Sequence, residues 1–141
     1  MKLGWVILKA TERAMKTIKI EEHFKQSAGE VWEIFADVTR CDWVPEIEKI
    51  TLSGDVRKFD MAGLGEVQER IILLDAEQRK LHYSVIKARS VLEHHLAKIH
   101  IIEADEGCHF FWETEIAPDE YAPAIAQGMQ SAFAQLQKIL A

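Results

Sequence analysis

The pattern of apolar and polar positions predicts a chain rich in strands that ends in one long helix. Between residues 121 and 141, apolar side chains recur every three or four positions, which places them along one face of a helix with 3.6 residues per turn. Pro123 fits the first turn of such a helix, because its missing N–H group has no helical partner there. About 19 residues at ~1.5 Å each span roughly 28 Å, which is enough to cross a small sheet.

Two short helices are predicted near the start of the chain. Ser27 and Glu30 have the spacing of a capping box, in which each side chain satisfies a free backbone donor of the other residue. An apolar stripe follows and ends near Asp37. A second short helix is predicted over residues 39–43, and Pro45 ends it because the residue before a proline avoids helical geometry.

Alternating apolar and polar side chains predict seven strands. They cover residues 17–25, 46–53, 56–61, 66–75, 80–87, 91–104 and 108–117. Short turns join the last six strands, which favours an antiparallel meander. Because the helices lie on one side only, the sheet must curl around the final helix to bury both apolar faces. The expected fold is therefore α+β, with a curved seven-stranded antiparallel sheet around a long C-terminal helix.

A chain of 141 residues fits a single domain. We assign the domain to residues 15–141, because the strand pattern follows Met15, which is itself a plausible start. Residues 1–14 form an N-terminal extension, and an upstream start codon is one interpretation of it. Their apolar stretch is far too short to span a membrane. An interfacial anchor through Trp5, Val6 and Ile7 is the alternative interpretation.

Charge and cysteine content narrow the class of partner. A formal net charge of -6 argues against nucleic acid, because phosphate binding requires a basic surface. Cys41 and Cys108 are far apart and lack metal-like spacing, so we interpret them as free thiols of a cytoplasmic protein. No metal site is expected, since His94 and His95 point to opposite faces of a strand. Stable membrane insertion is not expected, and the oligomeric state is left open.

The predicted inward faces of the strands carry ionisable side chains among apolar ones. A buried charge costs several kcal/mol unless it is paired or hydrated. Arg57 is therefore expected to pair with Glu69 on the adjacent strand, to line a wet cavity, or both. The candidate ligand-binding residues are Arg57, Phe59, Met61, Glu69, Tyr83, Val85, His95, Ala97, Phe110 and Trp112 on the strands, and Ile125, Met129 and Phe133 on the final helix.

Several of these residues stand in a recognisable order. The relevant segments are Gly54-Asp55-Val56-Arg57, Val67-Gln68-Glu69-Arg70, Leu81-His82-Tyr83-Ser84-Val85, and Gly107 with Trp112, preceded by Val31-Trp32 and Trp43-Val44-Pro45. Over residues 16–140 the chain resembles the polyketide cyclase/dehydratase and lipid-transport family of the START-related (SRPBCC) ligand-binding superfamily.

The resemblance implies a helix-grip fold, in which the sheet grips the C-terminal helix around a deep cavity. It also implies that Trp112, Tyr83, Arg57 and Glu69 occupy recurrent positions of the family. Relatives often carry an aromatic or polar residue where this chain has His95, so the pocket is expected to be more ionisable here. Members of the family bind lipids, hormones or polyketides, and some cyclise or dehydrate them.

Three functions are compatible with these observations. The first is binding or transport of a small hydrophobic or amphipathic molecule between the sheet and the last helix. The second is a cofactor-independent cyclase or dehydratase, in which Glu93 orients His95 for proton transfer and Tyr83 assists. The third is a protein-interaction module without a ligand. No cofactor is expected for any of them.

Overall fold

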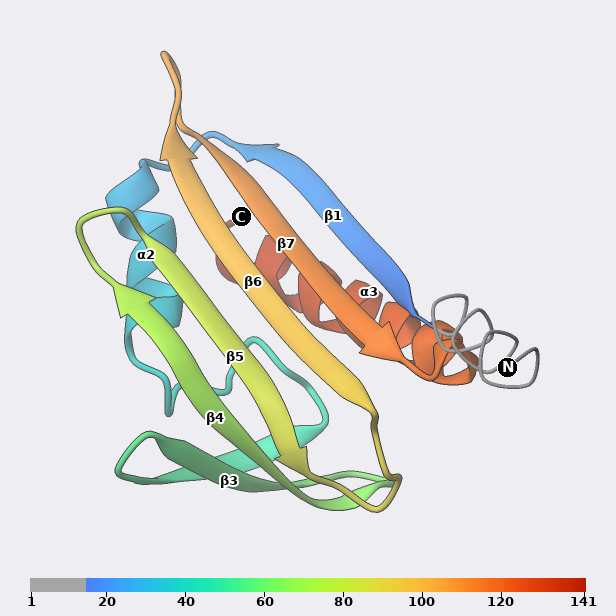
Figure 1. The fold of residues 1–141 in the computed structure, drawn as a ribbon. Coiled ribbons are helices and arrows are strands. Elements are labelled where there is room, and N and C mark those ends of the chain that lie inside the picture. Colours follow the sequence, from blue (N-terminus) through green and yellow to red (C-terminus); the bar gives the residue numbers. More distant parts are fainter. Residues whose placement is uncertain (1–14) are drawn as a thin grey trace.

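The computed structural model describes residues 15–141 (Figure 1). The predicted extension and its alternative role as an anchor concern residues 1–14, which lie outside the described residues. The strands are β1 (Lys16–Phe24), β2 (Ile47–Ser53), β3 (Val56–Met61), β4 (Gly65–Asp75), β5 (Lys80–Lys87), β6 (His94–Glu103) and β7 (Cys108–Ala117). The helices are α2 (Ala28–Ala36), the 3₁₀ turn η1 (Asp119–Tyr121) and α3 (Ala122–Ile139). The predicted α+β fold is confirmed.

The strands form one sheet in the order β1-β7-β6-β5-β4-β3-β2. Every neighbouring pair is antiparallel, so β2 to β7 make a meander and β1 closes against β7. Irregular register between Ile71 and Leu73 interrupts the β4–β5 pairing, and a bulge of this kind bends and twists a sheet. In Figure 1 the sheet curves in front of α3. The curvature gives the sheet an inward face, toward α3, and an outward face.

The core lies between the inward face and the two helices. Met129, Ala132, Phe133 and Leu136 form the buried stripe of α3, at the three- and four-residue spacing that the sequence predicts. The Phe133 ring stacks with the ring of Phe110 on β7 at a centroid distance of 6.0 Å. Burying aromatic rings of this size contributes strongly to stability, and such pairing adds about 0.5–1.5 kcal/mol. The stacking therefore fixes α3 against the β1–β7 half of the sheet.

Helix α2 begins with the predicted capping box. Ser27 Oγ accepts a hydrogen bond from the backbone N–H of Glu30 at 3.2 Å, and Glu30 Oε1 accepts one from the N–H of Ser27 at 3.4 Å. Behind this cap, Val31, Ile34 and Phe35 are buried in the core. The helix thus packs through the apolar stripe that follows its cap in the sequence.

The second predicted short helix does not form. Residues 37–46 make turns instead. The carboxylate of Asp37 accepts hydrogen bonds from both the N–H and the hydroxyl of Thr39, at 3.0 and 2.7 Å, and Arg40 binds Asp42 at 2.7 Å. Asp and Thr side chains that bond to nearby backbone offer the chain an alternative to helix. The prediction failed because these local bonds outweigh a weak apolar pattern.

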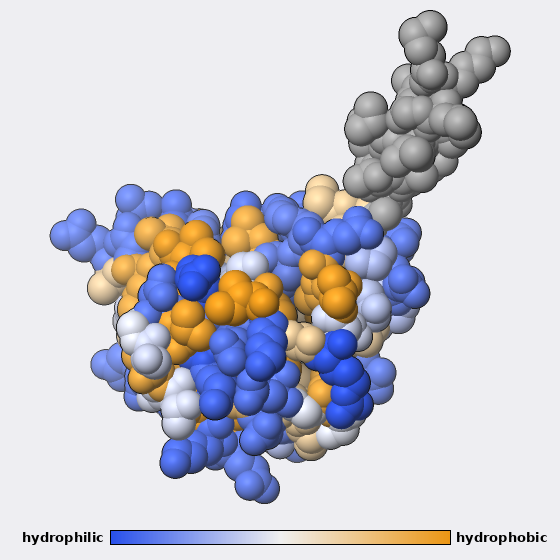
Figure 2. Space-filling view, turned by 60° about the horizontal axis from the view of Figure 1, so that its bottom comes forward, coloured by the Kyte–Doolittle hydropathy of each residue, from blue (hydrophilic) through white to orange (hydrophobic). Residues whose placement is uncertain are grey.

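The structure also shows the state of the two cysteines and the character of the helices. Cys41 is half-buried and Cys108 is buried, and both are free thiols. None of the helices in residues 15–141 has the length and hydropathy that a membrane span requires. Figure 2 shows hydrophobic patches among hydrophilic residues on one face of the molecule.

Candidate functional site

Five nearly buried polar side chains gather on the inward face of the sheet. They are Arg57 on β3, Glu69 on β4, Tyr83 on β5, His95 on β6 and Trp112 on β7, each at most 9% exposed. Strand register explains the grouping, because residues directly opposite each other share a face. Arg57 lies opposite Glu69, and Tyr83 and Trp112 lie opposite buried inward residues of β6. We call these five residues the polar cluster.

An ion pair anchors one end of the polar cluster. Arg57 Nε donates to Glu69 Oε1 at 2.7 Å, and Arg57 Nη1 donates to the carbonyl oxygen of Val38 at 3.0 Å. The guanidinium also lies 4.6 Å from the centre of the Tyr83 ring, within the range of a cation–π contact. Burial raises the pKa of the Glu69 carboxyl, and the adjacent Arg57 opposes that effect. The predicted pairing is confirmed, and it holds Arg57 in one orientation.

His95 is a neutral histidine with a defined tautomer. The backbone N–H of Val85 donates to His95 Nδ1 at 3.0 Å, so the ring proton of the neutral form is on Nε2. Burial, together with a smaller effect of the nearby His94, lowers the pKa of His95 to about 4. The Ser84 hydroxyl donates to the backbone carbonyl of His95. With Nδ1 occupied and Nε2 protonated, His95 is a hydrogen-bond donor rather than a base.

Tyr83 and Trp112 present further donors. Burial raises the pKa of Tyr83 far above its usual range, so the phenol is neutral and can donate its proton. The indole N–H of Trp112 acts in the opposite direction and lowers the pKa of that phenol. Trp112 Nε1 nevertheless makes no hydrogen bond of acceptable geometry within residues 15–141. An indole N–H can only donate. The polar cluster therefore offers neutral donors, and one of them, Trp112 Nε1, is buried without a well-formed hydrogen bond.

Glu93 lies outside the polar cluster. It was expected to orient His95, but β6 begins at His94, and Glu93 is exposed just before the strand. Its backbone N–H bonds to the carbonyl of Ala117, which ties the residue to the end of β7. The backbone of Val85 orients the imidazole instead. The expectation that Glu93 faces inward beside His95 is wrong, because side chains alternate between the two faces only within the strand, which begins at His94.

The apolar candidates divide between two clusters. Tyr83, Ala97, Phe110, Trp112, Met129 and Phe133 belong to the larger one, with Ile125 packed half-buried against it. Phe59 belongs to the smaller one, against which Met61 and Val85 pack half-buried. The candidates therefore do not line one continuous surface. The Val44 side chain touches both clusters, which marks residues 37–46 as the segment between them.

Aromatic side chains occupy the space beneath α3. The Trp43 ring contacts the rings of Phe35 and Trp112 at centroid distances of 5.0 and 5.6 Å. Sequence reasoning did not identify Trp43 as part of the site, although the Trp43-Val44-Pro45 segment is among those that carry the family resemblance. The ring was missed because its place follows from the path of a segment without regular structure.

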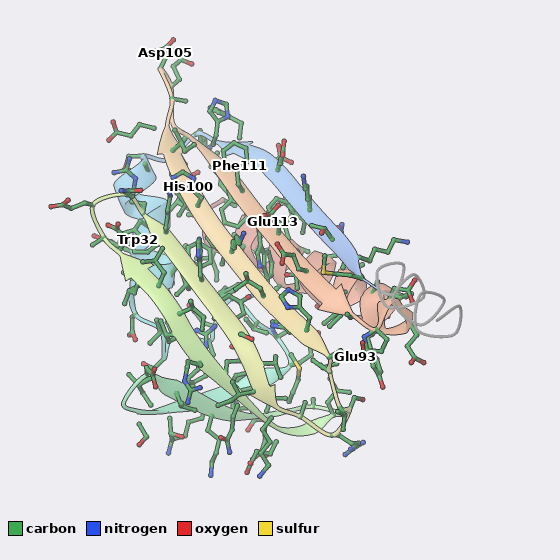
Figure 3. All side chains as sticks on the ribbon, in the orientation of Figure 1. Trp32, Glu93, His100, Asp105, Phe111 and Glu113 are labelled. Carbon is green, nitrogen blue, oxygen red and sulfur yellow. The ribbon has the colours of Figure 1, made fainter. Side chains whose placement is uncertain are left out.

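Two hollows stand out on the described residues, and neither lies between the polar cluster and α3. One, of about 430 Å³, lies between the end of β1 and the C-terminal end of α3. The other, of about 360 Å³, lies on the outward face and includes His100, Phe111 and Glu113 in its lining, which Figure 3 shows turned away from α3. The cavity that the sequence predicts coincides with neither hollow.

The outward face also carries most of the remaining histidines. His94 Nε2 lies 2.9 Å from Glu115 Oε1, and the pKa values of His82 and His100 are lowered, mainly by burial. Within residues 15–141, no group of three or more His, Cys, Asp or Glu side chains is placed to hold a metal ion.

Comparison with solved structures identifies the fold. XoxI from Bacillus cereus is 24% identical, with 90% of this chain and 95% of that chain covered and a TM-score of 0.73. An uncharacterised protein from Bacillus thuringiensis is 23% identical, covering 90% and 98%, with a TM-score of 0.74. Norcoclaurine synthase from Thalictrum flavum, in complex with dopamine and hydroxybenzaldehyde, is 22% identical, covering 89% and 86%, with a TM-score of 0.71.

These likenesses show that the chain has the helix-grip fold. No known family profile matches the sequence, and no curated protein is recognisably similar to it. The narrower family that the sequence resembles stays a prediction. Because many functions share one fold, function has to be argued from the site.

Proposed function

We propose that this protein binds a small hydrophobic or amphipathic molecule, lipid-like or polyketide-like, on the inward face of the sheet beneath α3. The observation that carries the proposal is the indole N–H of Trp112: the residue is 5% exposed, and its Nε1 makes no hydrogen bond of acceptable geometry in the described residues. Leaving a buried donor unsatisfied costs roughly 1–3 kcal/mol. Such a group calls for an explanation, and a ligand that supplies the acceptor is the one we favour.

The polar cluster defines which group of the ligand would be recognised. Trp112, Tyr83 and His95 each present a neutral donor, whereas the charge of Arg57 is already balanced by Glu69. Neutral donors among apolar walls suit an uncharged acceptor such as a ketone or ester oxygen. The body of the ligand would then pack against apolar side chains of the core. The helix-grip fold supports this proposal, since norcoclaurine synthase holds small aromatic molecules.

The polar cluster supports binding better than cyclase or dehydratase chemistry. Enolisation or dehydration requires a group that accepts a proton near neutral pH. His95 has its Nδ1 lone pair engaged by Val85 and a pKa of about 4. Tyr83 is a neutral phenol, and Glu69 is bound to Arg57. No cofactor is part of the proposal.

A second candidate is a protein-interaction module that holds no small molecule. The observation that favours it is the filled space beneath α3, where Trp43 packs between Phe35 and Trp112. Under this alternative, function would reside on the surface, which carries both hollows. The two candidates differ in whether any small molecule stabilises the protein.

Native mass spectrometry of the full chain, purified gently from its host, tests the proposal. We expect a retained small molecule, or a rise in the thermal unfolding temperature with members of a panel of ketones, phenols and fatty acids. Trp112→Phe keeps an aromatic ring and removes the donor, so it should weaken binding about 5- to 10-fold. Trp32→Phe is the matched control, because Trp32 is a buried tryptophan of α2 outside the polar cluster. Absence of both a retained mass and stabilisation would overturn the proposal and favour the interaction module.

A further inference from the structure

Trp43 places a second indole against the unpartnered donor of the polar cluster. It is 6% exposed, and its ring meets the Trp112 ring edge-on at 5.6 Å with an interplanar angle of 68°. It also meets the Phe35 ring at 5.0 Å and 76°. Residues 37–46, which carry Trp43, have no regular secondary structure. An aromatic side chain from an irregular segment thus fills the room beside Trp112.

The segment is anchored at its two ends. Near the first end, the carbonyl oxygen of Val38 accepts a hydrogen bond from Arg57 at 3.0 Å. At the other end, the hydroxyl of Ser131 on α3 donates to Glu46 Oε1 at 3.0 Å. Both bonds are at least three residues from Trp43. Displacement of the indole would therefore not require these two bonds to break.

Between these anchors, one long-range hydrogen bond reaches the segment from another element. The amide of Gln135 on α3 donates to the carbonyl oxygen of Asp42 at 3.3 Å, at an exposed position. The remaining hydrogen bonds near Trp43 are local, such as those from the N–H of Val44 to the carbonyl of Cys41 and from the N–H of Ile47 to the carbonyl of Val44. Ring contacts rather than hydrogen bonds hold Trp43 in the core.

With Trp43 packed in the core, two buried polar atoms make no hydrogen bond within residues 15–141. They are Trp112 Nε1 and Glu46 Oε2. One belongs to the side chain that Trp43 packs against, and the other to the segment that carries Trp43. An indole ring has no acceptor to offer Trp112, so Trp43 fills the space without satisfying the donor. A molecule of similar shape that carries an acceptor would do both.

We propose that Trp43 is the specificity-determining residue of this site: its indole occupies the place of the ligand, and a ligand binds by displacing it. The inference rests on the proposed function. It specifies a flat apolar group about the size of indole, with an acceptor oxygen directed at Trp112 Nε1. The apparent affinity of the wild-type protein is then the intrinsic affinity multiplied by the fraction of molecules in which Trp43 has left its place.

Binding of 1-indanone to three full-length proteins tests the inference. This probe is a flat bicyclic ketone of indole size, and indane is the same shape without the oxygen. Trp43→Ala should bind 1-indanone at least tenfold more tightly than wild type, because it removes the competing ring. Trp32→Ala, which removes an equally buried indole from α2, should show no gain. Adding Trp112→Phe to Trp43→Ala should abolish the preference for 1-indanone over indane.

Displacement is observed directly by fluorine NMR of wild-type protein labelled with 5-fluorotryptophan. The Trp43 signal is assigned from Trp43→Phe and should move toward the solvent-exposed position on saturation with 1-indanone. Circular dichroism and thermal unfolding check the fold of each variant. Trp43→Leu, which keeps apolar bulk, replaces Trp43→Ala if the latter does not fold and should show a smaller gain in affinity.

The outcomes separate failure of the inference from failure of the proposed function. If wild type binds 1-indanone and the Trp43 signal does not move, the inference is wrong and the binding function stands. If the Trp43 variants bind but saturating 1-indanone leaves wild type unbound, Trp43 is a structural filler and the inference is wrong. If wild type and both Trp43 variants all fail to bind 1-indanone and the wider panel, the proposed function fails as well.

Discussion

Acidification from about pH 7.5 to about pH 4.5 should cost this fold about 2.5 kcal/mol through His95 alone. The pKa of His95 is lowered from 6.5 to about 4 in the folded protein, chiefly by burial. The unfolded chain therefore takes up a proton near pH 6.5 while the folded chain does not. The contribution of His95 to stability is fully present above pH 6.5. This contribution is lost as the pH falls toward the pKa of His95 in the folded protein, and below that pKa it changes no further.

Replacement by asparagine isolates this effect. His95→Asn removes the titrating group and keeps a side-chain oxygen that can accept from the N–H of Val85, as Nδ1 does at 3.0 Å. Urea unfolding followed by tryptophan fluorescence gives the free energy of unfolding at each pH. Wild type should lose about 2.5 kcal/mol more than His95→Asn on acidification, or roughly 1 M in urea midpoint at a typical slope.

Other groups that titrate in this range, including His82 and His100, are common to both proteins and cancel in the difference. Equal losses in the two proteins would refute the assignment of a neutral, buried His95. They would also remove His95 Nε2–H from the donors of the polar cluster. The measurement thus tests the electrostatics of the site without any ligand.

Three further predictions concern stability, each measured as the free energy of unfolding in urea. Arg57→Met leaves the Glu69 carboxylate buried without its partner and should cost about 3–5 kcal/mol. Combining Arg57→Met with Glu69→Leu should recover most of that loss. No recovery would mean that packing, not charge, dominates the effect. Gly107→Ala should cost several kcal/mol, because a Cβ atom would meet the backbone of β1 at 1.9 Å. Gly54 also has a positive φ but has open space around it, so Gly54→Ala should cost only about 1 kcal/mol. Ser27→Ala should cost about 1 kcal/mol by removing the N-cap of α2, and an unchanged stability would show that the cap is replaced by water.

Much of the fold could be predicted because its elements depend on local patterns. Strands β3, β5 and β7 have the predicted bounds, and the buried stripe of α3 has the predicted spacing. These segments alternate strictly or repeat at helical spacing, and tertiary packing agrees with the local preference. Strand β6 was predicted to begin at residue 91 but begins at His94. Val91, which precedes it, remains 86% exposed because it has no partner strand.

The candidate site was predictable where it depends on strand alternation and not where it depends on loop path. Alternation identified Arg57, Glu69 and His95 as inward residues, and register brought Arg57 to Glu69. The contact of Trp43 with Trp112 joins a turn segment to a strand 69 residues later in the chain. No periodic signal encodes such a contact. The same holds for the Val85 N–H that orients His95, since it depends on how β5 and β6 diverge.

The polar cluster is hard to explain as a device for stability alone. An ion pair as buried as Arg57–Glu69 often contributes less than apolar residues of the same volume would. A neutral His95 makes the fold sensitive to acid, and Trp112 leaves a buried donor unsatisfied. Each of these features costs stability at a position where the alternating pattern would accept an apolar residue. Their gathering on one face, where the ring of Trp43 packs against Trp112, is the physical reason to look for a ligand there.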